Sequence, residues 1–205
     1  MAVATAPGPP LPSDWLARES LPVIEVSALF RVHRSEHHPI FFGPPKNAAP
    51  AGRFNCVCNC FRALYAAENF NGALVEGLIR NPGRRYVDPR EIRMRSYSSL
   101  ACSRPLRLIR LFGGGLQQVG SDATVVSGPH EHSRIWSKAL WAHGEEADGI
   151  AYHARHDDEL LCYAIWCRAE RFIEVENTRP LSPADCEVTD ALIRYNKILT
   201  PERHS

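Results

Sequence analysis

Apolar and polar positions along the chain predict a mixture of short strands and helices. Strands are indicated where apolar residues run for a few positions or alternate with polar ones. The clearest are ALYAA at 63–67 and LLCYAIWC at 160–167, which are apolar enough to be buried. The predicted strands cover residues 29–33, 53–57, 63–67, 91–102, 106–112, 149–155, 160–167 and 171–176.

Helices are predicted where apolar residues recur every three or four positions. Asn69 or Asn71 suits the N-cap of the first helix, and Ser182 suits that of the last. The first helix carries Glu76, which we expect near its first turns. A further segment, from Val23 to Ala28, fits a helical entry into the first strand. The main predicted helices cover residues 70–80, 129–144 and 181–199.

These elements follow one another in a mixed order, without the strict strand–helix alternation of a doubly wound sheet. The order predicts an α+β fold in which compact mixed or antiparallel sheets are flanked by helices. A chain of 205 residues has room for one sizeable core, so we expect a single domain over residues 19–205. The Pro/Ala-rich residues 1–18 are predicted to form a flexible N-terminal arm.

The composition is that of an ordinary globular protein, with 44% hydrophobic and 23% charged residues. No run of eighteen apolar residues is present, so we expect no membrane association. The first residues lack the basic and apolar regions of a secretory signal. Seven cysteines, an odd number, fit a reduced protein better than a disulfide framework. Together these features predict a cytoplasmic protein.

Positive charge is concentrated in one stretch, although the net charge is only +1. Nine arginines lie between Arg80 and Arg110, against the acids Asp88 and Glu91. Arginine suits forked contacts with phosphate or carboxylate groups, but we favour solvated strand faces and salt bridges as the explanation of this stretch. The small net charge and the absence of a recognition motif argue against direct nucleic-acid binding.

Three cysteines alternate with other residues at Cys56, Cys58 and Cys60. On a strand their thiols would share one face. Zinc sites, however, usually combine a pair of cysteines two to four residues apart with a second pair or with histidines. We therefore interpret these thiols as core filling and expect no metal.

Arg31 interrupts an apolar run and alternates to the face opposite Phe30 and Val32. Two interpretations are open. Arg31 is either a surface residue of a half-exposed strand or an arginine that the sheet holds rigidly toward a cleft.

Several segments, taken in order, resemble the RES domain family, the toxins of bacterial RES–Xre toxin–antitoxin pairs. They are LFRVHR, HPIFFGP, GRFN, LYAAENFNGALVE and DGIAYHARHD with the apolar strand that follows. The resemblance runs from about Leu29 to about Arg168. It implies a compact α+β domain similar to the ADP-ribosyltransferase fold.

The resemblance also implies an enzyme that acts on NAD as its substrate. Such an enzyme cleaves the nicotinamide–ribose bond as a glycohydrolase or phosphorylase, or transfers ADP-ribose to a target. Matching the family's motifs assigns the catalytic residues to Glu76, Arg31 and Tyr65. The residues implied in NAD binding are Arg31, Arg53, Tyr65, Tyr152 and Arg155.

Cleavage of the nicotinamide–ribose bond requires a carboxylate, cationic donors and an aromatic ring. Breaking the nicotinamide–ribose bond builds positive charge on the ribose, which the Glu76 carboxylate would stabilise. The pyrophosphate needs forked cationic donors, here Arg31 and Arg53. Tyr65 would stack on the nicotinamide or ribose and exclude water. Nicotinamide leaves from a cationic ring, so no strong general acid is needed.

One position departs from the family pattern Tyr-x-Ser-Arg. The chain has Ala154 where the family has serine, and alanine offers no side-chain hydrogen bond. Another hydroxyl, such as that of Ser127 or Ser133, would have to replace it. The alternative is a catalytically impaired RES-like protein that binds NAD or a protein partner without turnover.

The resemblance implies partners as well. Family members are held by an Xre-type antitoxin, which has a helix-turn-helix domain and covers the NAD cleft. The resemblance also allows a homodimer of the toxin within that complex.

Overall fold

The computed structural model of the chain describes residues 10–15, 20–43, 52–143 and 146–201. Within these ranges the apolar segments form a six-stranded sheet of order β1-β2-β6-β5-β4-β7. Strands β4 and β5 run parallel, and the other neighbouring pairs run antiparallel. The strands are β1 (Val23–Arg34), β2 (Ala63–Ala67), β4 (Arg95–Arg110), β5 (Gly149–Ala154), β6 (Asp157–Trp166) and β7 (Ile173–Pro180).

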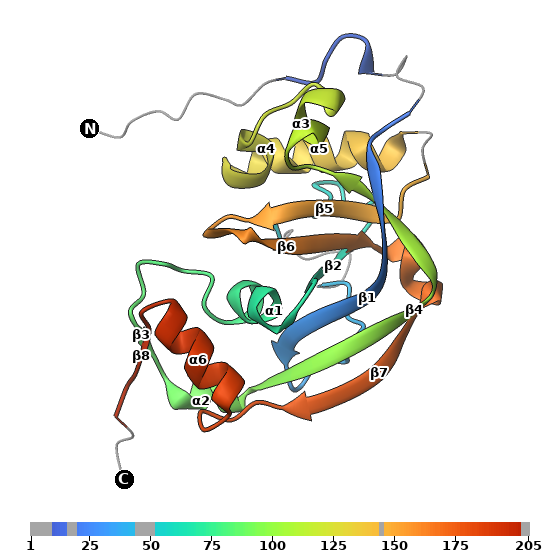
Figure 1. Cartoon of the computed structure of the whole chain (residues 1–205). Helices are drawn as coiled ribbons and strands as arrows, with labels where there is room; N and C mark the ends of the chain where they lie inside the picture. Colours follow the sequence, from blue (N-terminus) through green and yellow to red (C-terminus); the bar gives the residue numbers. More distant parts are fainter. Residues whose placement is uncertain (1–9, 16–19, 44–51, 144–145, 202–205) are drawn as a thin grey trace, which may run out of the picture.

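The sheet closes on itself because β1 pairs with β4 as well as with β2. Strands β1, β2, β6, β5 and β4 therefore form a ring, and β7 extends it from β4. Figure 1 shows β4 as the long strand that connects the helices at the two ends of the molecule. Closure of the ring pairs both edges of β1 and fixes its position relative to β4 and β2.

Strand β4 is continuous where the sequence predicted two strands. Its register against β1 shifts between Val26 and Ala28, so residues 102–105 bulge. Pro105 lies in this bulge, where its missing backbone N–H breaks no ladder hydrogen bond. Residues 91–93, predicted to begin a strand, belong instead to a short helix that Asp88 caps.

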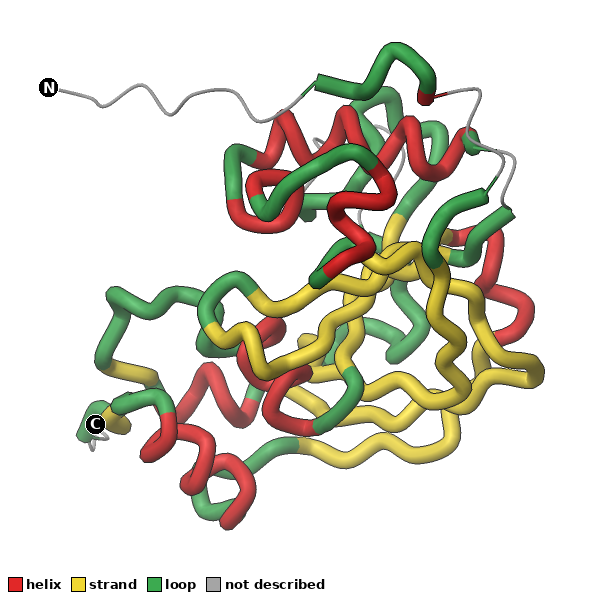
Figure 2. Tube along the Cα trace, turned by 45° about the horizontal axis from the view of Figure 1, so that its top comes forward, coloured by secondary structure: helices red, strands yellow, loops and turns green. Residues whose placement is uncertain are grey.

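Helices gather at two ends of the sheet. Helices α3, α4 and α5 lie together over β5, whereas α6 lies near α2 and the short β3–β8 pair (Figures 1 and 2). The remaining elements are α1 (Phe70–Gly77), α2 (Pro89–Arg93), α3 (Gly114–Val119), α4 (Thr124–Ser127), α5 (His130–Ala142), the 3-10 helix η2 (Cys167–Phe172), α6 (Cys186–Arg194), β3 (Tyr86–Val87) and β8 (Ile198–Leu199).

Alternate residues of the strands face two hydrophobic cores. Leu29 of β1 belongs to a core to which all strands of the ring contribute, and Val32 belongs to the core that includes residues of helices α1, α5 and α6. Ile165 and Trp166 of β6 divide in the same way. This alternation confirms that Arg31 lies on the face opposite Val32.

Two predictions about helix ends can be compared with the structure. Asn69 caps α1, since its side chain accepts a hydrogen bond from the backbone N–H of Gly72 at 2.9 Å. The last helix begins later than predicted, with Asp185 rather than Ser182 at its N-cap position. The Ser182 hydroxyl instead accepts from the backbone N–H of Ala184 in the preceding turn, at 3.2 Å.

The strand predicted at 53–57 is wrong, because residues 52–62 form turns and bends. The backbone N–H of Phe54 donates to the Tyr65 hydroxyl at 2.8 Å, and the Ser137 hydroxyl donates to the Phe54 carbonyl at 2.8 Å. Side chains therefore satisfy both backbone groups of Phe54, and no strand partner is needed. The predicted helical entry before residue 29 is also wrong, since Val23–Arg34 is strand throughout.

Part of the predicted N-terminal arm, residues 1–9 and 16–18, lies outside the described residues. Of the described part, Trp15 is buried and packs edge-on against Trp136 of α5, with ring centroids 5.6 Å apart. Its ring also lies 5.5 Å from that of His143. Residue 15 is therefore part of the hydrophobic core to which α5 also contributes.

The predicted α+β class, with a mixed sheet flanked by helices, is confirmed. In the described ranges, no helix is both long enough and apolar enough to cross a membrane.

Candidate active site

A cleft of about 510 Å³ opens beside the ends of β1, α1 and β5. All six residues that the sequence singled out line it, although they come from five separate parts of the chain. They are Arg31, Arg53, Tyr65, Glu76, Tyr152 and Arg155.

The cleft is strongly cationic. Among the described residues, six arginines and four histidines line it, and Glu76 contributes the only carboxylate. Such a surface favours an anionic ligand and leaves one negative group at a fixed point. The arginines are Arg31, Arg34, Arg53, Arg80, Arg95 and Arg155, and the histidines are His33, His37, His130 and His156.

Glu76 lies in the last turn of α1 rather than near its first turns, because the helix already ends at Gly77. A Cβ on Gly77 would come within 2.5 Å of the Val32 carbonyl oxygen. The glycine therefore lets the end of α1 approach the backbone of β1, and this approach sets the position of Glu76 in the cleft.

Two buried groups hold the Glu76 carboxylate. The Tyr152 hydroxyl of β5 and the Cys162 thiol of β6 both donate hydrogen bonds to it. Tyr152 and Cys162 are direct cross-strand partners, so their side chains share one face of the sheet. The carboxylate is thus fixed by two strands and by its own helix.

Burial raises the pKa of Glu76, and the nearby arginines Arg80 and Arg53 and the two donors oppose this shift. The pKa of Tyr152 is also raised, first by burial and then by the charge of Glu76. A buried hydroxyl that stays protonated is a reliable donor to a carboxylate. Ionised Glu76 therefore still accepts hydrogen bonds from the Tyr152 hydroxyl and the Cys162 thiol near neutral pH.

Tyr65 anchors the turn at the mouth of the cleft. Its hydroxyl accepts from Phe54 N–H and donates to Asn55 Oδ1, each at 2.8 Å. A Cβ on Gly52 would collide with the Tyr65 hydroxyl and with Asn55. Burial raises the pKa of Tyr65, so the hydroxyl remains a donor.

Arg53 connects this turn to the start of α5. Its Nη1 donates to the Gly128 carbonyl at 2.5 Å and to the Ser133 hydroxyl at 3.0 Å. Burial, followed by the positive charge of Arg155, lowers the pKa of Arg53. An anion bound between these two guanidinium groups would offset their electrostatic repulsion.

Arg31 is not a surface residue. Burial lowers its pKa to about 10, and its Nη1 donates to the Pro39 carbonyl at 2.8 Å and the Phe41 carbonyl at 3.0 Å. These bonds attach the loop after β1 to the strand. Of the two interpretations of Arg31, the structure favours the arginine held rigidly at a cleft.

The two serines considered as replacements for a serine at position 154 do not line the cleft. Ser133 is buried and binds Arg53, so it supports the site from outside. The Ser127 hydroxyl donates to the Ala123 carbonyl within the α4 turn. Ala154 is buried on the same face of β5 as Tyr152 and adds no polar group there.

Several cleft residues escaped the sequence interpretation. Arg80 lies four positions after Glu76, a helical spacing that could have indicated it. His130, at the first position of α5, carried no such signal. Cys162 does not line the cleft but supports Glu76 from behind, and nothing in its apolar strand indicated that role. Burial, then the charge of Arg53, lowers the pKa of His130, so this ring is neutral near pH 7.

Comparisons with known proteins find related sequences and a similar fold. The sequence profile of the RES domain matches residues 28–185. A protein named "Probable toxin y4kH" from Sinorhizobium fredii is 33% identical over 104 residues, which are 50% of this chain and 80% of that protein. The crystal structure of the M. tuberculosis MbcT-MbcA toxin–antitoxin complex contains a chain of similar fold. That chain is matched with a TM-score of 0.61 and 15% identity, over 83% of this chain and 92% of its own length.

Proposed function

Because the chain belongs to the RES domain family, we propose that it is the toxin of a toxin–antitoxin pair and that it consumes NAD. The reaction we propose is cleavage of the bond between nicotinamide and its ribose. The relative named as a toxin and the toxin–antitoxin structure of similar fold support this assignment.

The observation that carries the proposal is the position of Glu76. It is the single carboxylate among the described lining residues of an arginine-rich cleft, and two buried donors fix it. NAD has a matching charge pattern, with a dianionic pyrophosphate and a cationic nicotinamide–ribose end. The arginines would bind the pyrophosphate, and Glu76 would face the ribose.

Cleavage breaks the bond between the ribose carbon and the nicotinamide nitrogen. The bonding pair leaves with neutral nicotinamide, and positive charge develops on the ribose ring. Ionised Glu76 would stabilise this charge, with the Tyr152 hydroxyl and Cys162 thiol holding the carboxylate in place. Burial raises the pKa of Glu76 and so disfavours its ionised form. The positive charge of the nicotinamide–ribose end of NAD would oppose this shift and favour the carboxylate.

The acceptor is water, phosphate or a protein side chain, and each leaves a different product. Water gives ADP-ribose, phosphate gives the phosphorylated ADP-ribose, and a protein gains the mass of one ADP-ribosyl group. Mass spectrometry after incubation with NAD, with and without phosphate, distinguishes them. We expect loss of NAD with wild-type protein and none above background with Glu76→Gln. Intact NAD at high enzyme concentration with phosphate present would contradict the proposal.

Ala154 supports a second candidate, a RES-like protein that binds NAD without turnover. Its methyl group is buried next to Tyr152, where a serine could have added a hydroxyl. In this case NAD would raise the melting temperature and remain unconsumed. Turnover gained on Ala154→Ser would decide for this candidate, whereas turnover by the wild-type chain would exclude it.

We also propose an antitoxin partner, of the Xre type with a helix-turn-helix domain, that covers the cleft in a cytoplasmic complex, with a homodimer of the toxin inside it. The supporting observation is that the solved structure of similar fold is a toxin–antitoxin complex. Expression without the antitoxin is expected to arrest growth, and co-expression to restore it. Growth arrest that Glu76→Gln leaves unchanged would contradict an NAD-based toxicity.

A further inference from the structure

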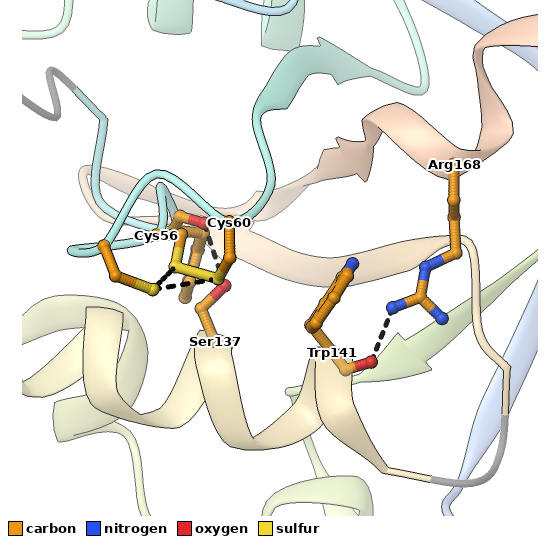
Figure 3. The surroundings of a disulfide bond; sticks show 7 residues. Cys56, Cys60, Ser137, Trp141 and Arg168 are labelled. Carbon is orange, nitrogen blue, oxygen red and sulfur yellow. Dashed lines mark hydrogen bonds between the residues drawn. A yellow bond between two sulfur atoms is a disulfide. The ribbon is translucent and has the colours of Figure 1, made fainter. Parts of the chain in front are cut away.

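Three cysteine sulfurs converge at the outer side of the turn that carries Arg53. Cys56 and Cys60 form a disulfide, and Cys58 Sγ lies 3.1 Å from Cys56 Sγ and 3.0 Å from Cys60 Sγ (Figure 3). Cys56 is buried, whereas Cys58 and Cys60 are exposed. The interpretation of all three as core filling is therefore correct only for Cys56.

The backbone of the turn is shaped to bring these sulfurs together. Asn59 adopts a left-handed conformation with φ 53°, and its N–H donates to the Cys56 carbonyl at 3.2 Å. Asparagine tolerates this conformation better than most residues. Because the chain reverses at Asn59, the three sulfurs lie within 4.8 Å of one another. On an extended strand the three thiols would share one face but would be spread along it.

Both ends of the turn are anchored to the core. Before the cysteines, the Ser137 hydroxyl of α5 binds the Phe54 carbonyl, as Figure 3 shows beside the disulfide. After them, the Phe61 ring stacks on Trp141 and meets Trp166 edge-on. Anchors on both sides keep the three sulfurs together after the disulfide is reduced, since they do not depend on that bond.

The ligand set indicates the kind of ion that would fit. Cys56, Cys58 and Cys60 are the only group of three candidate metal ligands in the described parts of the chain, and their sulfurs lie within 4.8 Å of one another. Thiolates are soft ligands that select copper(I), zinc or iron–sulfur clusters. A structural zinc site requires four protein ligands. In the part of the chain that the structure describes, no fourth His, Cys, Asp or Glu ligand joins the three sulfurs. Three thiolates suit copper(I), which is stable with three ligands.

We propose that the three cysteines, in their reduced form, bind one copper(I) ion. A dithiol first reduces the Cys56–Cys60 bond: it becomes a disulfide itself, and the two cysteines gain its two electrons and two protons. The three thiols then release three protons as their sulfurs bind copper(I). None of the three cysteines is among the lining residues of the NAD cleft, so this site is separate from the proposed reaction.

The test uses full-length protein, reduced and kept without oxygen. Copper(I) is titrated in competition with a coloured copper(I) chelator, and the ultraviolet thiolate-to-copper absorption is followed. We expect uptake of one equivalent by wild-type protein. Cys58→Ser, which removes an exposed ligand, is expected to lower the affinity more than tenfold. Cys186→Ser removes an exposed cysteine at the start of α6, outside the group, and should leave the affinity unchanged.

Equal copper binding by wild-type and Cys58→Ser protein would overturn the proposal. So would uptake of zinc(II) in preference to copper(I), because it would require a fourth ligand. Circular dichroism checks that Cys58→Ser is folded. NAD consumption by copper-free Cys58→Ser should equal that of copper-free wild type. Failure of copper binding would therefore leave the proposed NAD reaction intact, and failure of the NAD reaction would leave the copper proposal intact.

Discussion

At the scale of single residues, the site depends on the ionisation of Glu76. The pKa of this carboxyl is raised by burial, so the acid limb of the pH–rate profile should lie above the usual range of glutamate. Glu76→Gln keeps the shape but not the charge. We expect it to lower kcat/KM by roughly 10²–10³-fold, the usual loss when a stabilising electrostatic group is removed. NAD turnover measured from pH 4 to 8 checks both expectations.

The same shift has a consequence for stability. In the unfolded chain Glu76 titrates near its ordinary pKa of 4.5, and in the folded protein it holds its proton to higher pH. The folded state therefore binds more protons between the two values, and its stability falls as pH rises through them. Glu76→Gln should melt a few degrees higher than wild type at pH 7 and lose this advantage near pH 4. A Tm lower than that of wild type at pH 7 would contradict the assignment of a buried, destabilising charge.

Cys162 is expected to position Glu76 rather than to react. Cys162→Ala removes one donor to the carboxylate, so the pKa of Glu76 should rise and the acid limb should move to higher pH. We expect kcat to fall roughly tenfold, the effect of losing one hydrogen bond to a charged group, with little change in KM. Cys162→Ser supplies a hydroxyl of similar reach and should restore both. A Cys162→Ala protein with an unshifted pH profile would argue that the thiol only packs.

The sequence predicted which residues line the cleft, but not the contacts that hold them there. All six predicted site residues line the cleft, yet the Tyr65 hydroxyl is occupied by Phe54 N–H and Asn55. A role in stacking on the substrate remains a prediction for its ring. No pattern in the sequence could show that a hydroxyl on β2 reaches back to the backbone eleven residues earlier, because that contact depends on the tertiary fold.

At the scale of elements, the junction of α1 with β1 determines where Glu76 lies. Gly77→Ala would force a Cβ against the Val32 carbonyl, and overpacking of this kind costs roughly 1–3 kcal/mol. Urea unfolding should show a lower midpoint with an unchanged slope. Gly114→Ala is a matched control, because the nearest atom to its Cβ is the end of the Arg110 side chain at 3.7 Å. A similar loss in both variants would contradict a specific contact between α1 and β1.

Elements with strong local signals were predicted well, and those that depend on distant partners were not. β2 matches its apolar run residue for residue, and α1 starts after one of its two predicted caps. Residues 53–57 of the turn at 52–62 were wrongly predicted as a strand, since the partners that stabilise the turn, Tyr65 and Ser137, lie on other elements. The sequence predicted two strands, 91–102 and 106–112, where β4 is continuous, and Pro105 lies in the bulge beside β1.

At the scale of the whole molecule, a nearly neutral chain concentrates positive charge in one cleft. Arg155 is exposed at its edge, after the end of β5. Arg155→Gln should weaken ADP-ribose binding roughly tenfold, as expected for one charge-assisted contact, and should reduce the salt dependence of binding. Isothermal titration at two ionic strengths measures both effects. Arg171→Gln, an exposed change outside the cleft, is the control, and equal weakening in both variants would indicate only a general charge effect.

The closed ring of strands also governs when the cleft comes into existence during translation. Glu76 leaves the ribosome first, but the strands that carry Tyr152 and Cys162 follow only near the end of the domain. At roughly 5–20 residues per second, synthesis of the intervening segment takes on the order of 5–20 seconds. During that interval the nascent chain has the carboxylate without its two donors and the ring without its closing strands. A ribosome can therefore complete most of this polypeptide before the cleft exists in its finished form.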